Sequence, residues 1–171
     1  YAGKNASSEG WIVGFFDDEN WMALALMRAF DLTGQAAYLA KAEEIYSDIA
    51  TNAPDTTCCG PNPGGIWWDK AHTSKATASN MGAVIVAARL TQRTGKDHLP
   101  FAKQVYDYWL KYMVDPATNQ VLDHINDGDS APTRWKFTYN EGLAIGASLE
   151  LYKSTKDAKY LENAHKFAAF M

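Results

Sequence analysis

The chain has 171 residues, of which 47% are hydrophobic and 21% are charged, a composition that suits a single soluble globular domain. Its formal net charge of −4, with no basic stripe, argues against a nucleic-acid partner. No apolar run approaches the roughly 20 residues that cross a bilayer, so we expect no membrane span. The sequence begins without Met or a charged, apolar leader, and we expect any signal peptide to be absent or already removed.

Apolar residues recur at helical spacing along most of the chain, which predicts an all-α fold. The helices are expected at 19–33, 37–49, 82–94, 99–113, 142–155 and 158–170. Short turns join them in pairs, which predicts three antiparallel helix hairpins in one domain, residues 1–171. The three repeat units run over about 17–50, 78–113 and 139–171.

A fixed spacing relates the three hairpins. Thr33, Thr94 and Thr155 each close the first helix of a unit, and they are 61 positions apart. Gly34 and Gly95 follow two of them, at the position where glycine permits the left-handed turn that ends a helix. This period is the signature of a repeat architecture.

Long connections join one hairpin to the next, over 52–77 and 114–138. Loops longer than about 12 to 15 residues are usually functional or disordered. These are rich in Trp, Asp and Asn, and aromatic residues make up 13% of the chain, as is common in sugar-binding clefts. Because the short turns share one end of the hairpins, the long loops are expected to gather at the other, where each first helix begins.

Polar residues stand at all three of these helix starts. With the 61-residue period, Asp18 corresponds to Ser79 and Asn140. N-capping explains Ser79, and it is one of two interpretations of Asn140. It does not explain two adjacent acids, because one cap suffices, so Asp17 and Asp18 are expected to have a functional role.

Four segments together resemble glycoside hydrolase family 76, the endo-α-1,6-mannanases, from about Phe15 to the end of the chain. They are Phe16-Asp17-Asp18-Glu19-Asn20-Trp21, Gly64-Gly65-Ile66-Trp67-Trp68, Ser79-Asn80 and Phe137-Thr138-Tyr139-Asn140-Glu141-Gly142. The paired aspartates and the tandem tryptophans are the most specific parts of this resemblance.

The resemblance implies an (α/α)6 toroid of six hairpins with a sugar cleft at one end. Three hairpins would then be the N-terminal half of the ring, and the activity of this portion alone is doubtful. It also implies retaining hydrolysis of α-1,6-linked mannan, with Asp17 as nucleophile and Asp18 as general acid/base. Fungal relatives imply a secreted or cell-surface location and transglycosylation at the cell wall as a further activity.

The residues themselves permit this chemistry. Retaining glycosidases hold two carboxyl groups about 5 to 5.5 Å apart, and adjacent residues, whose Cα atoms are about 3.8 Å apart, can meet that separation. Substrate contacts are expected from the loops and the helix starts. The candidates are Trp67, Trp68, Asn80, Trp135, Tyr139, Asn140 and Glu141. For each of Trp67 and Trp68 the other interpretation is a ring that anchors its loop in the core, and Trp135 is as suited to packing as to stacking.

Other chemistries find little support. The segment 123–129, DHINDGD, has Ile125 where a calcium loop needs an oxygen ligand, so it is interpreted as a solvated acidic loop that could instead line the cleft. The four histidines show no ligand spacing, and adjacent Cys58 and Cys59 without a second pair do not make a zinc site. We therefore expect no metal and no cofactor. Asn5 begins a glycosylation sequon, which has meaning only in a secreted eukaryotic protein.

Two alternative functions remain open. A noncatalytic carbohydrate-binding helical repeat would keep the Trp-rich rim without needing both Asp17 and Asp18. Another six-hairpin sugar enzyme, such as an epimerase or an unsaturated-glucuronyl hydrolase, would use other acids or histidines, and this chain has no His at a helix start.

Overall fold

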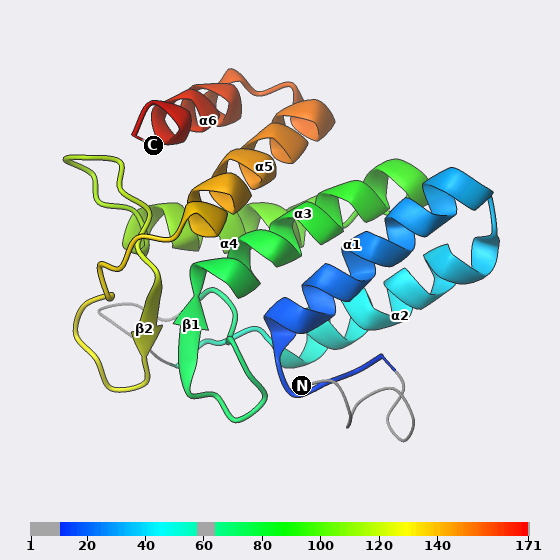
Figure 1. Cartoon of the computed structure of the whole chain (residues 1–171), viewed down its shortest axis with the longest axis horizontal. Helices are drawn as coiled ribbons and strands as arrows, with labels where there is room; N and C mark the ends of the chain where they lie inside the picture. Colours follow the sequence, from blue (N-terminus) through cyan, green and yellow to red (C-terminus); the bar gives the residue numbers. More distant parts are fainter. Residues whose placement is uncertain (1–10, 58–63, 171) are drawn as a thin grey trace.

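The computed structural model describes residues 11–57 and 64–170. Within these ranges six helices form three hairpins, and two short strands lie in the connections (Figure 1). The helices are α1 (Phe16–Thr33), α2 (Ala36–Asn52), α3 (Thr77–Thr94), α4 (Leu99–Tyr112), α5 (Thr138–Thr155) and α6 (Ala158–Phe170). The predicted all-α fold of repeated helix hairpins is therefore confirmed. No helix in the described ranges has the length and hydropathy to cross a membrane.

The first helix of each hairpin packs against the next, so that α1, α3 and α5 lie side by side with α3 in the middle (Figure 1). The core lies around α3, which is buried along most of its length. Close packing of α1 and α3 depends on Gly82, since a Cβ there would lie 2.8 Å from the Asn20 side-chain nitrogen. That nitrogen donates a hydrogen bond to the Ser79 carbonyl oxygen, at 2.9 Å.

The 61-residue period recurs in the backbone. The three first helices are followed by Gly34, Gly95 and Lys156, all in the left-handed conformation, with φ of 70°, 74° and 61°. Only the first two are glycine, the residue that adopts this conformation without strain.

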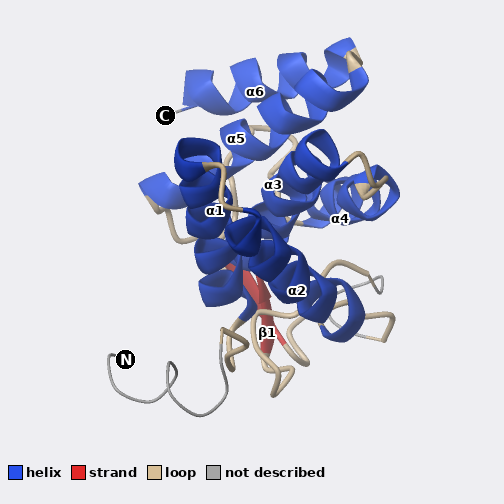
Figure 2. Cartoon of the chain, turned by 90° about the vertical axis from the view of Figure 1, so that its right-hand side faces the viewer, coloured by secondary structure: helices blue, strands red, loops and turns tan. Residues whose placement is uncertain are grey.

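The long loops gather at the helix starts, as predicted, and a small sheet joins them (Figure 2). Strand β1 (Ser74–Ala76) pairs antiparallel with β2 (His124–Asn126), with Lys75 opposite Ile125. An isolated bridge between Phe15 and Asp69 ties the first long loop to the start of α1. Three stretches of chain distant in sequence therefore meet at one end of the hairpins.

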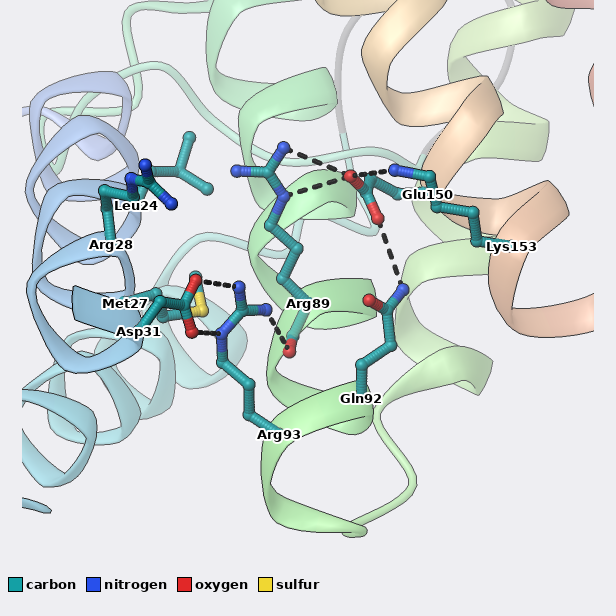
Figure 3. Close-up of a pocket in the computed structure, with 9 residues that line it drawn as sticks. All are labelled: Leu24, Met27, Arg28, Asp31, Arg89, Gln92, Arg93, Glu150 and Lys153. Carbon is teal, nitrogen blue, oxygen red and sulfur yellow. Dashed lines mark hydrogen bonds and ion pairs between the residues drawn. The ribbon is translucent and has the colours of Figure 1, made fainter. Parts of the chain in front are cut away.

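Charged side chains connect the far ends of the same helices (Figure 3). Nε of Arg93 donates to Asp31 of α1 at 2.9 Å, and Nε of Arg89 donates to Glu150 of α5 at 3.1 Å. Cations near helix C-termini are favourable, because the helix dipole places negative potential there. The hollow that these side chains line, about 280 Å³, is thus explained as a polar link between α1, α3 and α5.

Candidate active site

A cavity of about 380 Å³ opens at the end where the long loops gather. The helices α1, α3 and α5 each contribute one residue of their first turn, and the two long loops supply the rest. The lining residues are Asp17, Trp68, Thr73, Ser74, Ala76, Ala78, Asp123, His124, Asn126 and Tyr139.

Backbone hydrogen bonds explain why the loops lie over the helix starts. The first turn of a helix has N–H groups without partners in the helix. The N–H of Phe16 donates to the Trp68 carbonyl, and that of Thr77 donates to the Asp123 carbonyl, both at 2.8 Å. Each bond places a cavity residue directly beside a helix start.

These bonds replace the side-chain caps expected from the sequence. The capping residues of α1, α3 and α5 are Phe15, Ala76 and Phe137, and none makes a side-chain cap hydrogen bond. Ser79 and Asn140 lie inside the first helical turn, so their interpretation as N-caps is wrong. The three helices begin three to five residues earlier than the sequence pattern predicts, and for α1 and α3 loop carbonyls accept from the first helical N–H.

Asp17 is the α1 residue in the cavity. Burial raises the pKa of its carboxyl group, and the neighbouring charge of Asp18 acts in the same direction. A hydrogen bond from the Trp68 side chain opposes this rise, as does the Asp18 backbone N–H, which donates to Asp17 Oδ1 at 3.1 Å. Asp17 is therefore a half-buried carboxylate with two N–H donors, close to a second acid.

Asp18 follows in the first turn of α1 and is half-buried, and its side chain is not part of the lining of this cavity. Its charge contributes to the raised pKa of Asp17. The structure thus puts Asp17 inside the cavity, with Asp18 next to it in the first turn of α1.

A third carboxylate, Asp123, organises the opposite wall. Its Oδ1 accepts a hydrogen bond from Asn140 Nδ2 at 2.7 Å and lies 3.5 Å from the Tyr139 hydroxyl, which donates to it. Its Oδ2 lies 2.7 Å from Nδ1 of His124. The segment 123–129 was expected to be either a solvated acidic loop or part of the cleft wall. Asp123, His124 and Asn126 all line the cavity, so the second alternative holds for this part of the segment.

The two tryptophans point in different directions. Trp68 is half-buried, lines the cavity and contacts the Phe15 ring at 4.8 Å between centroids. Trp67 is 4% exposed, stacks on His72 at 4.8 Å and lies under the Lys75 ammonium group. Of the two interpretations, anchoring in the core fits Trp67, whereas Trp68 keeps its place as a candidate for sugar binding.

Asn80 fixes the loop that carries Trp67 and Trp68 through hydrogen bonds to its backbone. It is fully buried, its Oδ1 accepts from the Ile66 N–H at 3.0 Å, and its Nδ2 donates to the carbonyls of Ile66 and Ala76. Its amide is therefore occupied by the backbone, and we remove Asn80 and Trp67 from the candidate substrate-binding residues.

The remaining candidates lie at different depths around the rim. Tyr139 is 48% exposed and lines the cavity, and the charges of Asp123 and Asp17 add to burial in raising its hydroxyl pKa. Asn140 is buried and reaches the cavity through Asp123. Trp135 is 60% exposed and touches His124 at 5.7 Å between centroids. Glu141 instead lines a separate hollow of about 160 Å³ beside Phe170.

Sequence reasoning gave no role to Glu19, which directly follows the acidic pair and is fully buried. Its Oε1 accepts a hydrogen bond from the Val13 N–H at 3.0 Å and lies 3.2 Å from Nζ of Lys70, which also pairs with Asp48 of α2 at 2.8 Å. Because Lys70 is two residues beyond Trp68, this cluster fastens the Trp68 segment to α1.

Within residues 11–57 and 64–170, no three His, Cys, Asp or Glu side chains converge as metal ligands would. Asn5, Cys58 and Cys59 lie outside the described residues.

The sequence matches glycosyl hydrolase family 76 over residues 2–171. The mannan endo-1,6-alpha-mannosidase DCW1 of Candida glabrata is 30% identical over 166 residues, 88% of this chain and 36% of that protein. The protein of the same name from Saccharomyces cerevisiae is 26% identical over 153 residues, which cover 81% of this chain and 34% of its own length. The chain thus spans about a third of these yeast relatives.

Solved structures share the fold. The GH76A α-1,6-mannanase of Salegentibacter is 31% identical, with a TM-score of 0.86 over 95% of this chain and 48% of that one. The Lin0763 protein of Listeria innocua is 34% identical, with the same TM-score over 93% of this chain and 45% of that one. An inactive variant of the Salegentibacter enzyme has two consecutive aspartates replaced by asparagine and is in complex with α-1,6-mannotriose. The chain belongs to glycosyl hydrolase family 76.

Proposed function

We propose that this chain carries the catalytic acids of a retaining endo-hydrolase of α-1,6-linked mannan. The observation that carries the proposal is the position of Asp17, inside a cavity bounded by Trp68 and Tyr139 and beside a second acid. The inactivated Salegentibacter variant supports it, because consecutive aspartates occur only once in this sequence, at Asp17 and Asp18.

In the proposed reaction Asp17 attacks the anomeric carbon of a mannosyl unit and displaces the glycosidic oxygen, to which Asp18 donates a proton. Asp18 then takes a proton from water, and that water attacks the same carbon and releases Asp17. The N–H groups of Trp68 and Asp18 stabilise the ionised Asp17 carboxylate that attack requires, against burial and the charge of Asp18, which raise its pKa.

Sugar contacts in this proposal come from Trp68 and Tyr139, which line the cavity, and from the exposed Trp135 beside it, while Asn140 positions Asp123. The whole protein would be a six-hairpin (α/α)6 toroid of which this chain is the N-terminal half. It would act outside the cell or at its surface, by hydrolysis or by transfer of the mannosyl chain to another acceptor.

The test is digestion of α-1,6-mannan by the natural full-length protein and its Asp17→Asn and Asp18→Asn variants, with reducing ends as the readout. Each variant is expected to lose roughly 10²-fold or more in rate, the contribution typical of a catalytic acid or base. Asp107→Asn, at an exposed acid on α4, is the matched control and should keep full activity. A folded protein that binds mannan without cleaving it would instead support the noncatalytic carbohydrate-binding alternative.

A further inference from the structure

A chain of four rings borders the active-site cavity on one side. His124 contacts Trp135 at 5.7 Å, Trp135 contacts Phe137 at 6.3 Å, and Phe137 contacts Tyr139 at 5.3 Å between centroids. Both end members, His124 and Tyr139, line the cavity. The middle members, Trp135 and Phe137, therefore lie just beyond its rim.

The geometry singles out Trp135 within this aromatic chain. Its ring is 60% exposed, against 37% for Phe137. Phe137 and Tyr139 lie nearly parallel, at 16°, so they cover part of each other, whereas Trp135 meets Phe137 at 87° and His124 at 67°. Trp135 is thus an exposed ring that two neighbours support through tilted, edge-type contacts.

Such an exposed ring is costly to leave in water, and it already contacts two neighbouring rings. A large side chain held by ring contacts loses little rotamer freedom on binding a ligand, which favours affinity. The adjacent cavity of about 380 Å³ is near the lower end of the roughly 300 to 1,000 Å³ typical of small-molecule sites. A longer oligosaccharide must therefore continue over the surface outside the cavity.

We propose that Trp135 forms a distal mannosyl subsite. Its ring stacks on a sugar ring outside the cavity and so gives the protein a preference for longer mannan chains. Phe137 acts as a positioning residue, because it holds the Trp135 ring from one side and rests on Tyr139 from the other. The inference rests on the proposed function, since it takes α-1,6-mannan as the ligand.

The test compares α-1,6-mannotriose with α-1,6-mannohexaose. In a catalytically disabled Asp17→Asn background of the full-length protein, titration calorimetry gives the affinity for each sugar. Trp135→Ala should weaken hexaose binding by roughly threefold to tenfold and leave triose binding nearly unchanged. Trp135→Phe should restore most of the lost hexaose affinity, and Phe137→Ala should weaken hexaose binding by a smaller factor without affecting the triose. The control Trp11→Ala, at an exposed tryptophan outside the cavity, should change the affinity for neither sugar.

Equal loss for both sugars, or no loss for either, would overturn the distal subsite. Circular dichroism of each variant separates these results from misfolding. The titrations require no cleavage, so they test the subsite even if the parent protein is inactive. Inactivity would contradict the hydrolase proposal, whereas the subsite is tested only by the dependence of binding on sugar length.

Discussion

The buried carboxyl group of Glu19 should make the stability of the protein depend on pH. Burial raises its pKa from 4.5 to about 7, and the negative charge of Asp48 acts in the same direction, against Lys70 and the Val13 N–H. In the unfolded chain the pKa returns to its ordinary value, so the folded state holds an extra proton between these two pH values. This contribution to stability is fully present below pH 4.5 and is lost as the pH rises through about 7.

The size of the effect follows from the two pKa values. Each pH unit between them corresponds to about 1.4 kcal/mol, so Glu19 should account for a loss of about 3 kcal/mol across the interval. Glu19→Gln removes the titration and keeps an oxygen for the Val13 N–H and an amide nitrogen that can donate to Asp48. The substitution should therefore flatten the pH profile of stability.

Urea unfolding followed by tryptophan fluorescence measures this directly, at pH 5 and pH 8. The decrease in free energy of unfolding between the two should be about 2.5 kcal/mol smaller in Glu19→Gln than in the parent protein, because part of the full effect lies below pH 5. Glu162→Gln, at an exposed acid on α6, controls for the change of residue type. Parallel profiles for the parent and Glu19→Gln would mean that Glu19 titrates alike in the folded and unfolded states, which would contradict a raised pKa in the folded protein.

Two further predictions concern the support behind the cavity. Asn80→Ala should lower the free energy of unfolding by about 2 to 4 kcal/mol, because it leaves buried backbone groups of Ile66 and Ala76 unpaired, and urea titration measures this loss. Lys75→Met should cost about 3 to 5 kcal/mol, since the fully buried Lys75 pairs with Asp55 at 2.5 Å and its loss removes the cation that compensates the buried charge of Asp55. Thermal unfolding should show a smaller loss for the Lys75→Met and Asp55→Leu double variant than for Lys75→Met alone, and equal losses would contradict the pairing argument.

The ends of the first helices could be predicted well from the sequence, but their beginnings could not. Thr33, Thr94 and Thr155 are the last residues of α1, α3 and α5, as predicted, because the glycine after two of them is a local signal. The beginnings depend on carbonyl groups of Trp68 and Asp123, which are distant in sequence. A local sequence pattern cannot predict hydrogen-bond partners that lie far away along the chain.

The same limit applies to the site. Asp17, Trp68 and Tyr139 were candidates from the sequence and lie together in the cavity. Which of two adjacent tryptophans faces the core depends on the direction in which the loop enters, because successive side chains of extended backbone point to opposite sides. Asp123 reaches the cavity through the pairing of β1 with β2, a register that hydrophobic periodicity does not reveal.

The central claim is that Asp17 is the nucleophile of a retaining mannanase with Asp18 beside it as the acid/base. A mannose-configured carbasugar epoxide, which esterifies a nucleophilic carboxylate, tests it by peptide mass spectrometry of the full-length protein. A single label is expected on Asp17, abolished in Asp17→Asn and blocked by excess α-1,6-mannotriose. A label on Asp18 or on Asp123, or active enzyme that hydrolyses mannan and never takes the label, would contradict it.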